Sequence, residues 1–279
     1  MIIDRPKNIN INNEYEKLYK LYKIKDRSDY NGSIQKIECV INNERGLFKE
    51  RLSTQSKDHI MEQVAYDIAL ILGVSCCKNS CRKIKNGLYG SFSRFEVVDM
   101  NNVAEYSSII GIIDGSVDDI LNRTTQLTHG VNNFVIQLYQ YLIFDYILGQ
   151  LDRHMDNLSV YKSKNSIQWY PLYDNGYCCF STYGNDSAIQ SLKNGFYLSR
   201  LGYDNEIFES LYRHRNTIYS DDIRKIIRYN KINRDILIKI FNKANKYNQL
   251  TDERRDASIE FILGNIKDID ALNNRRSII

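Results

Sequence analysis

The sequence reads DRHMDN at residues 152–157 and DNG at residues 174–176, and the segment between these motifs decides how this region folds. Residues 158–161 and 167–173 are rich in apolar and aromatic side chains and flank a short polar turn, a pattern typical of two strands. An antiparallel hairpin returns the end of its second strand to the start of its first. The two motifs are therefore expected to meet at the open end of a hairpin.

Three side chains in these motifs carry oxygen atoms that suit a divalent cation. Asp152 and Asn157 are five residues apart, and Asp174 opens the second motif. Mg²⁺ prefers oxygen ligands, and phosphoryl transfer needs magnesium at the nucleotide phosphates and a carboxylate at the attacking hydroxyl. Protein kinases show the same order and spacing in their catalytic loop and metal-binding turn. The alternative is a pair of ordinary turns, in which Asp and Asn are common.

A candidate phosphate-binding lysine lies far upstream of these motifs. Residues 33–51 alternate like a β-hairpin with a turn at residues 42–46, and the pattern from residue 59 to residue 72 is helical. Lys49 ends the second strand of the hairpin, and Glu62 lies in the helix. A helix packed on the sheet would bring Glu62 within reach of Lys49. The alternative for each is a solvated surface charge.

Two further segments are candidate nucleotide contacts. Gly32 and Ser33 precede the hairpin, where a loop could cover the phosphates with backbone N–H groups. Glu96 and Val98 lie where the two halves of the chain join, so that their backbone could bind the adenine. Arg153 is either a phosphate contact or a strut of its loop, and the sequence leaves both options open.

The hydrophobic periodicity changes near residue 100. Strand-like patterns characterise residues 1–100, whereas residues 101–279 read mainly as helices, including a buried helix at 132–148 that ends near Gly149. This is an α+β arrangement with a natural cleft between its parts. Together with the kinase-like order and spacing of the motifs above, this arrangement predicts a two-lobed, protein-kinase-like fold with a β-rich N-terminal lobe and a mainly helical C-terminal lobe.

The composition is that of a folded chain. Hydrophobic residues make up 43% of the 279 positions and charged residues 26%, which argues against a disordered protein. The net charge is +4 without a long basic block, so we expect no binding to nucleic acid by the chain itself. No apolar run approaches the roughly 18 residues that cross a bilayer, and the N-terminus lacks a secretion-signal core. A cytoplasmic protein is expected, with export as an effector as the alternative.

The six cysteines lack the CxxC spacing that favours a structural zinc site. Five of them form two clusters, at residues 76–81 and 178–179, and Cys39 stands in a strand-like run. We expect reduced thiols packed as small hydrophobic side chains.

Taken together, the motifs resemble HipA-like serine/threonine kinases, in particular their short bacterial members. In chain order, the resemblance rests on Gly32-Ser33, residues 47–49, Glu62, residues 151–160 and residues 171–174. It implies that Asp152 is the catalytic base and that Asn157 and Asp174 bind magnesium. It also implies that Lys49 contacts the ATP phosphates and that Glu62 holds Lys49.

The same resemblance implies an ATP- and Mg²⁺-dependent kinase that phosphorylates a serine or threonine hydroxyl of a protein. Autophosphorylation would map onto Ser33, and an antitoxin or other regulatory partner is expected. Phosphoinositide kinases share an Asp-Arg-His-x-x-Asn loop, so a lipid or small-molecule kinase is one alternative. A nucleotide-binding pseudokinase is another, although such a protein has no chemical reason to keep all five site residues.

Overall fold

The computed structural model describes residues 36–41, 43–83, 89–96, 102–111, 116–127, 132–162, 167–194, 209–210, 213 and 222–276. Within these ranges, none of the helices combines the length and the apolar character needed to span a membrane. The expected phosphate loop at Gly32 and Ser33 and the expected adenine contact at Val98 lie outside the described residues.

Four antiparallel strands form the larger sheet, in the order β1-β2-β4-β3. The strands are β1 (Lys36–Ile41), β2 (Glu44–Glu50), β3 (Asn79–Lys83) and β4 (Tyr89–Arg94). The β1–β2 hairpin is confirmed, but the expected turn at 42–46 is too long, because Glu44 already pairs with Ile41. Asn43 has φ 64°, a left-handed conformation that Asn tolerates and that tight hairpin turns require.

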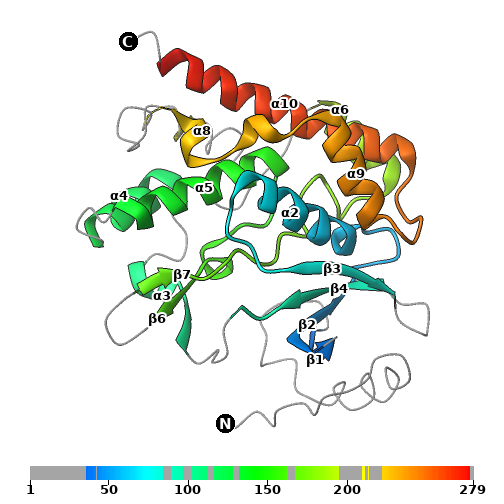
Figure 1. Ribbon diagram of the computed structural model, residues 1–279, viewed down its shortest axis with the longest axis horizontal. Coiled ribbons are helices and arrows are strands. Elements are labelled where there is room, and N and C mark those ends of the chain that lie inside the picture. Colours follow the sequence, from blue (N-terminus) through cyan, green and yellow to red (C-terminus); the bar gives the residue numbers. More distant parts are fainter. Residues whose placement is uncertain are drawn as a thin grey trace.

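Helix α2 (Asp58–Leu72) covers one face of this sheet (Figure 1). It ends at Gly73, whose φ of 77° provides the left-handed C-terminal cap. Twelve of its fifteen residues are buried, because its other side packs against α9 (Arg234–Ala244). A helix buried on both sides is apolar around most of its circumference, and the polar side chains that it does bury need partners.

A smaller antiparallel sheet has the order β5-β6-β7. Its strands are β5 (Val103–Glu105), β6 (Ser159–Lys162) and β7 (Ile167–Trp169). The β6–β7 hairpin between the two motifs is confirmed, but its strands are shorter than expected, since β7 ends at Trp169. Residues 170–176 therefore leave the sheet before they reach the site.

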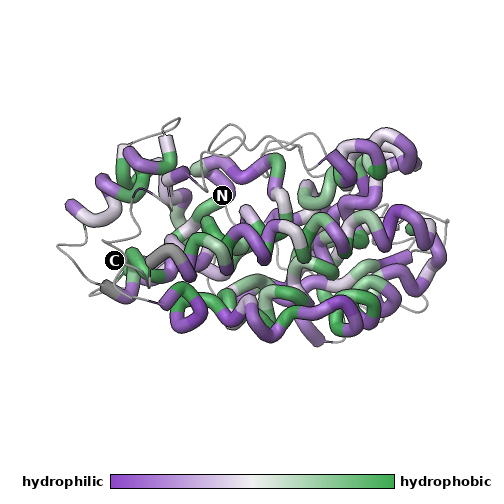
Figure 2. The backbone as a smooth tube through the Cα atoms, turned by 90° about the horizontal axis from the view of Figure 1, so that it is seen from above, coloured by the Kyte–Doolittle hydropathy of each residue, from purple (hydrophilic) through white to green (hydrophobic). Residues whose placement is uncertain are grey.

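Most of the remaining described chain is helical. Helix α5 (Asn132–Leu148) has the bounds expected from the sequence. The other helical segments are α3 (Ser107–Ile110), α4 (Val117–Leu127), η3 (Met155–Asn157), α6 (Asn185–Asn194), α8 (Ile223–Ile226), η4 (Tyr229–Lys231) and α10 (Asp252–Arg276). Hydrophilic and hydrophobic residues alternate along these helices (Figure 2).

A continuous cluster of buried apolar side chains extends from Ile60 in α2 to Leu272 in α10. Buried Cys81, Cys178 and Cys179 belong to this cluster, as expected for thiols used as small hydrophobic side chains. The division of the chain into lobes near residue 100 stays a prediction.

Candidate active site

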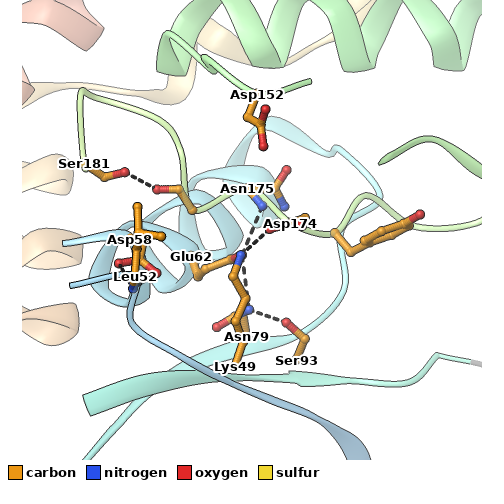
Figure 3. Close-up of polar contacts among 12 residues, drawn as sticks. Lys49, Leu52, Asp58, Glu62, Asn79, Ser93, Asp152, Asp174, Asn175 and Ser181 are labelled. Atoms are coloured by element: carbon orange, nitrogen blue, oxygen red, sulfur yellow. Dashed lines mark hydrogen bonds and ion pairs between the residues drawn. The ribbon is translucent and has the colours of Figure 1, made fainter. Parts of the chain in front are cut away.

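Strand β2 places Lys49 on the sheet face that α2 covers. Lys49 lies opposite Ser91 in β4, and Ser91 lies opposite Cys81 in β3. The backbone N–H of Cys81 donates a hydrogen bond to the side chain of Gln63 in α2 at 2.8 Å. The Lys49 ammonium is therefore buried between sheet and helix. There its Nζ lies 3.5 Å from Oε1 of Glu62 and forms an ion pair with Oδ1 of Asp174 (Figure 3).

The two carboxylates keep Lys49 charged. Burial alone would lower the pKa of Lys49, but Asp174 and Glu62 more than offset this effect and raise it above its ordinary value. Burial alone would raise the pKa of Asp174, but the Lys49 ammonium overcomes it and lowers that pKa to about 2. Lys49 and Asp174 are thus an ionised pair across the site.

Glu62 links α2 to the DNG turn. Its Oε2 accepts a hydrogen bond from the backbone N–H of Asn175 at 3.1 Å and another from Nδ2 of Asn79 at 3.3 Å. Burial raises the pKa of Glu62, although Lys49 opposes this shift. The carboxylate therefore depends on these donors as well as on the lysine, as a buried polar group must.

The DNG turn fits tightly against α2. Asp174 has φ 55°, a left-handed conformation that is uncommon outside glycine and that Asp tolerates better than most residues. A Cβ at Gly176 would lie 3.0 Å from the Asp58 carbonyl oxygen and 3.1 Å from Cγ of Glu62. A side chain at residue 176 would therefore push against α2, and glycine lets the turn pack closely where it brings Asp174 to Lys49.

The end of α5 directs the chain into the first motif. Gly149 has φ 59°, and its N–H donates to the Tyr146 carbonyl at 3.1 Å. The N–H of Gln150 donates to the Asp145 carbonyl at 2.9 Å, which completes a Schellman motif. Residue 150 therefore turns away from the helix axis toward the site.

Arg153, which the sequence left open, is a strut of the loop. Its guanidinium is fully buried and binds the Asp145 carboxylate with two nitrogens, at 2.9 and 3.1 Å. It also donates to the carbonyls of Asn157 and Tyr173, at 3.3 and 3.0 Å, and to Oδ1 of Asn175. These bonds join the DRHMDN loop to the DNG turn.

Asp152 and Asn157 form the two ends of the DRHMDN loop, and the loop brings these ends close to each other. Nδ2 of Asn157 donates to the Asp152 carbonyl at 3.0 Å, which leaves Oδ1 as the end of the amide suited to a cation. The Asp152 side chain points toward the side where Asp174 and Asn175 lie (Figure 3). A buried Gln150 lies between the segments: it accepts from the Asp152 N–H and donates to the Asp174 carbonyl, each at 3.2 Å.

The oxygen atoms offered by Asn157 and Asp174 suit a Mg²⁺ ion that also binds water and phosphate better than they suit a metal bound only by protein side chains. In the described part of the chain, no three His, Cys, Asp or Glu side chains gather closely enough to hold an ion. Asn157 and the ionised Asp174 would supply two oxygen ligands, and magnesium commonly takes its remaining ligands from water and substrate phosphates. The magnesium roles of Asn157 and Asp174 stay predictions that this chemistry supports.

Of the expected site residues, the structure brings Lys49, Glu62 and Asp174 into direct contact and holds Asp152 and Asn157 on the adjoining loop. Glu96 lies apart from this contact. Its carboxylate pairs with Arg94 at 2.8 Å, and its backbone N–H donates to the Tyr170 hydroxyl at 3.2 Å. That N–H is already used, and the adenine contact at Glu96 stays a prediction.

The sequence analysis did not identify Gln150, Asn175 or Asn79 as parts of the site. A weak signal existed for the first two, because Gln150 follows the helix-ending glycine and Asn175 lies within the DNG motif. For Asn79 there was none, since strand β3 itself was not expected.

Comparisons with known proteins find similar proteins through structure alone. The sequence matches no family model and no curated protein. The structure is similar to that of the Helicobacter pylori proinflammatory kinase CtkA, with a TM-score of 0.68 and 18% identity over 90% of this chain and 94% of that one.

A second similar structure comes from the Shewanella oneidensis MR-1 toxin–antitoxin system, a complex of HipA, HipB and operator DNA. Its TM-score is 0.53, with 12% identity over 99% of this chain and 73% of that one. The resemblance expected from the motifs is therefore confirmed at the level of the fold: this chain has the kinase-like fold of CtkA and HipA.

Proposed function

We propose that this protein is an ATP- and magnesium-dependent kinase that transfers the γ-phosphate to a serine or threonine hydroxyl of a protein. The observation that carries the proposal is the ion pair between buried Lys49 and partly buried Asp174. Glu62 lies beside this pair, and the Asp152–Asn157 loop is tied to the same turn. The likeness in fold to two proteins described as a kinase and as part of a toxin–antitoxin system supports it.

The residues divide the work as follows. Lys49 binds the nucleotide phosphates, and these anions replace Asp174 as the partner of its ammonium group. Glu62 holds the ammonium group in the site while it changes partners. Asp174 and Asn157 hold the magnesium ion, which neutralises charge on the phosphates when bound. Asp152 accepts the proton of the attacking hydroxyl, or orients that hydroxyl, in line with the γ-phosphate.

Three finer features belong to the same proposal. Ser33 is the expected site of autophosphorylation, and Gly32 belongs to the loop that covers the phosphates. Glu96 and Val98 are the expected backbone contacts of the adenine. A regulatory protein partner is proposed by analogy with HipA, which the complex contains together with HipB.

The test is incubation with labelled ATP and Mg²⁺, followed by mass spectrometry of the protein and of added protein acceptors. Asp152→Ala and Asp174→Asn should each lower transfer by about a thousandfold or more while the protein stays folded, because each removes a group that acts at the reacting atoms. Asn is the better replacement at residue 174, because it also tolerates the left-handed backbone.

Asp186→Asn, an exposed carboxylate on α6, is the matched control and should leave the rate unchanged. Transfer that persists in either site variant would contradict the assigned role. Label in a lipid or metabolite instead of protein would favour the small-molecule alternative. Tight ATP binding without turnover by the wild type would favour the pseudokinase.

A further inference from the structure

Gln150 lies between the two segments that carry the acidic groups of the site. Its Oε1 accepts the backbone N–H of Asp152, and its Nε2 donates to the backbone carbonyl of Asp174, both at 3.2 Å. The side chain is buried, with 1% of its surface exposed. One amide group therefore bridges two segments whose carboxylates have different proposed tasks.

The bridge needs a group that donates and accepts at once. A neutral primary amide does both, whereas an ionised carboxylate can only accept. A glutamate here would keep the bond to the Asp152 N–H but would place a negative oxygen against the Asp174 carbonyl, close to two further carboxylates. An alanine would remove the Gln150 partner from the Asp152 N–H and from the Asp174 carbonyl, and the loss of a partly buried hydrogen bond is costly for both groups.

We propose that Gln150 is a positioning residue that sets the spacing between Asp152 and Asp174. If the protein is the kinase proposed above, on which this step rests, the spacing fixes where the acceptor hydroxyl lies relative to the magnesium-bound phosphates. The role proposed for Gln150 acts through its two bonds to the backbone, not through a contact with the nucleotide or the acceptor. Its effect should therefore fall on turnover rather than on nucleotide binding, because misplacement by about 1 Å at a reacting centre can cost about a hundredfold in rate.

The chain offers a matched control on the same helix that leads to the site. Gln140 of α5 also donates its side-chain amide to a backbone carbonyl, that of Ile226, at 2.6 Å. It differs from Gln150 in being only partly buried and in joining α5 to α8, away from both motifs. Gln140→Ala and Gln140→Glu therefore report the structural cost of losing such a bond.

The first measurement compares kcat and KM for ATP in the wild type, Gln150→Ala, Gln150→Glu and both Gln140 variants. Gln150→Ala should lower kcat by about 10- to 100-fold with little change in KM. Gln150→Glu should also lower kcat, because an ionised carboxylate cannot donate a hydrogen bond to the Asp174 carbonyl. A wild-type kcat in Gln150→Ala, or an equal loss in Gln140→Ala, would overturn the inference.

The second measurement does not depend on catalysis. Hydrogen exchange at the Asp152 amide should be faster in Gln150→Ala and unchanged in Gln150→Glu and Gln140→Ala, because only alanine at residue 150 removes the acceptor. If the wild type transfers no phosphate, the proposed function fails, while exchange still decides whether Gln150 holds Asp152. Equal exchange in the wild type and Gln150→Ala overturns the inference in either case.

Discussion

At the scale of single residues, the ion pair between buried Lys49 and partly buried Asp174 makes the stability of the fold depend on pH. The Asp174 carboxyl has a folded-state pKa of about 2, below the ordinary value of 3.8. The unfolded chain therefore takes up a proton first as the pH falls. The stabilisation is fully present above about pH 4 and is lost as the pH falls toward 2.

Asp174→Asn should consequently lower the free energy of unfolding by about 2 kcal/mol at pH 6, which is the equivalent of the shift in pKa. The difference from the wild type should shrink as the pH is lowered toward 3. Urea titrations of both proteins across this range measure it. A difference that stays constant with pH would show that Lys49 does not stabilise the ionised carboxylate.

Arg153 is the second residue whose burial has a predictable cost. It is paired with Asp145, which is 2% exposed, so that removing one partner leaves an uncompensated charge. Arg153→Met should lower the free energy of unfolding by about 3–5 kcal/mol. The double variant Arg153→Met/Asp145→Asn should recover part of this loss in urea denaturation at neutral pH. A loss below about 1 kcal/mol in Arg153→Met would contradict the strut role.

At the scale of elements, replacing glycine should have opposite effects just after helix α5 and inside helix α10. Gly149 has φ 59°, whereas Gly264 lies inside α10 with open space where a Cβ would point. Gly149→Ala should destabilise the protein by about 1–2 kcal/mol, because alanine resists the left-handed conformation. Gly264→Ala should stabilise it by about 0.5–1 kcal/mol.

Thermal and urea unfolding of these two variants measure the contrast directly. A stabilising Gly149→Ala would mean that α5 does not need this turn, and the placement of Gln150 and Asp152 would lose its explanation. The same substitution at Gly264 controls for the general helix preference of alanine.

At the scale of the whole molecule, the buried helix α2 joins the β-rich and helical parts. It packs on β3 and β4 on one side and on α9 on the other, and Lys243 of α9 binds Asp67 of α2 at 2.7 Å. Neither part can bury the apolar surface of α2 alone. We therefore expect one cooperative unfolding transition in spite of the α+β division.

Two single-tryptophan proteins test this expectation. The wild type reports from Trp169 in β7, and Trp169→Phe/Tyr89→Trp reports from β4. Each protein should show the same urea midpoint by tryptophan fluorescence and by far-ultraviolet circular dichroism. Fluorescence that departs from the dichroism in either protein would show that the two parts unfold independently.

The parts that were predictable from sequence are those set by local periodicity and spacing. Helix α5 and most of α2 followed from apolar residues at helical intervals and a terminal glycine. The β1–β2 hairpin followed from alternation around a turn, and the β6–β7 hairpin followed from two apolar runs around a polar turn. Strands β3 and β5 were not anticipated. β3 consists mostly of polar residues and β5 has only three residues, so neither carries a clear periodic signal.

The amino-acid sequence by itself determined which chemical groups are present, in which order, and on which kind of element. Only the tertiary structure decided which of them meet. Lys49 and Asp174 are 125 residues apart, and no local pattern specifies that contact. It arises because α2 and the DNG turn pack against the same face of the sheet. The roles of Arg153 and Gln150 were equally hidden, since a hydrogen-bonding side chain is defined by partners that only the folded chain brings within reach.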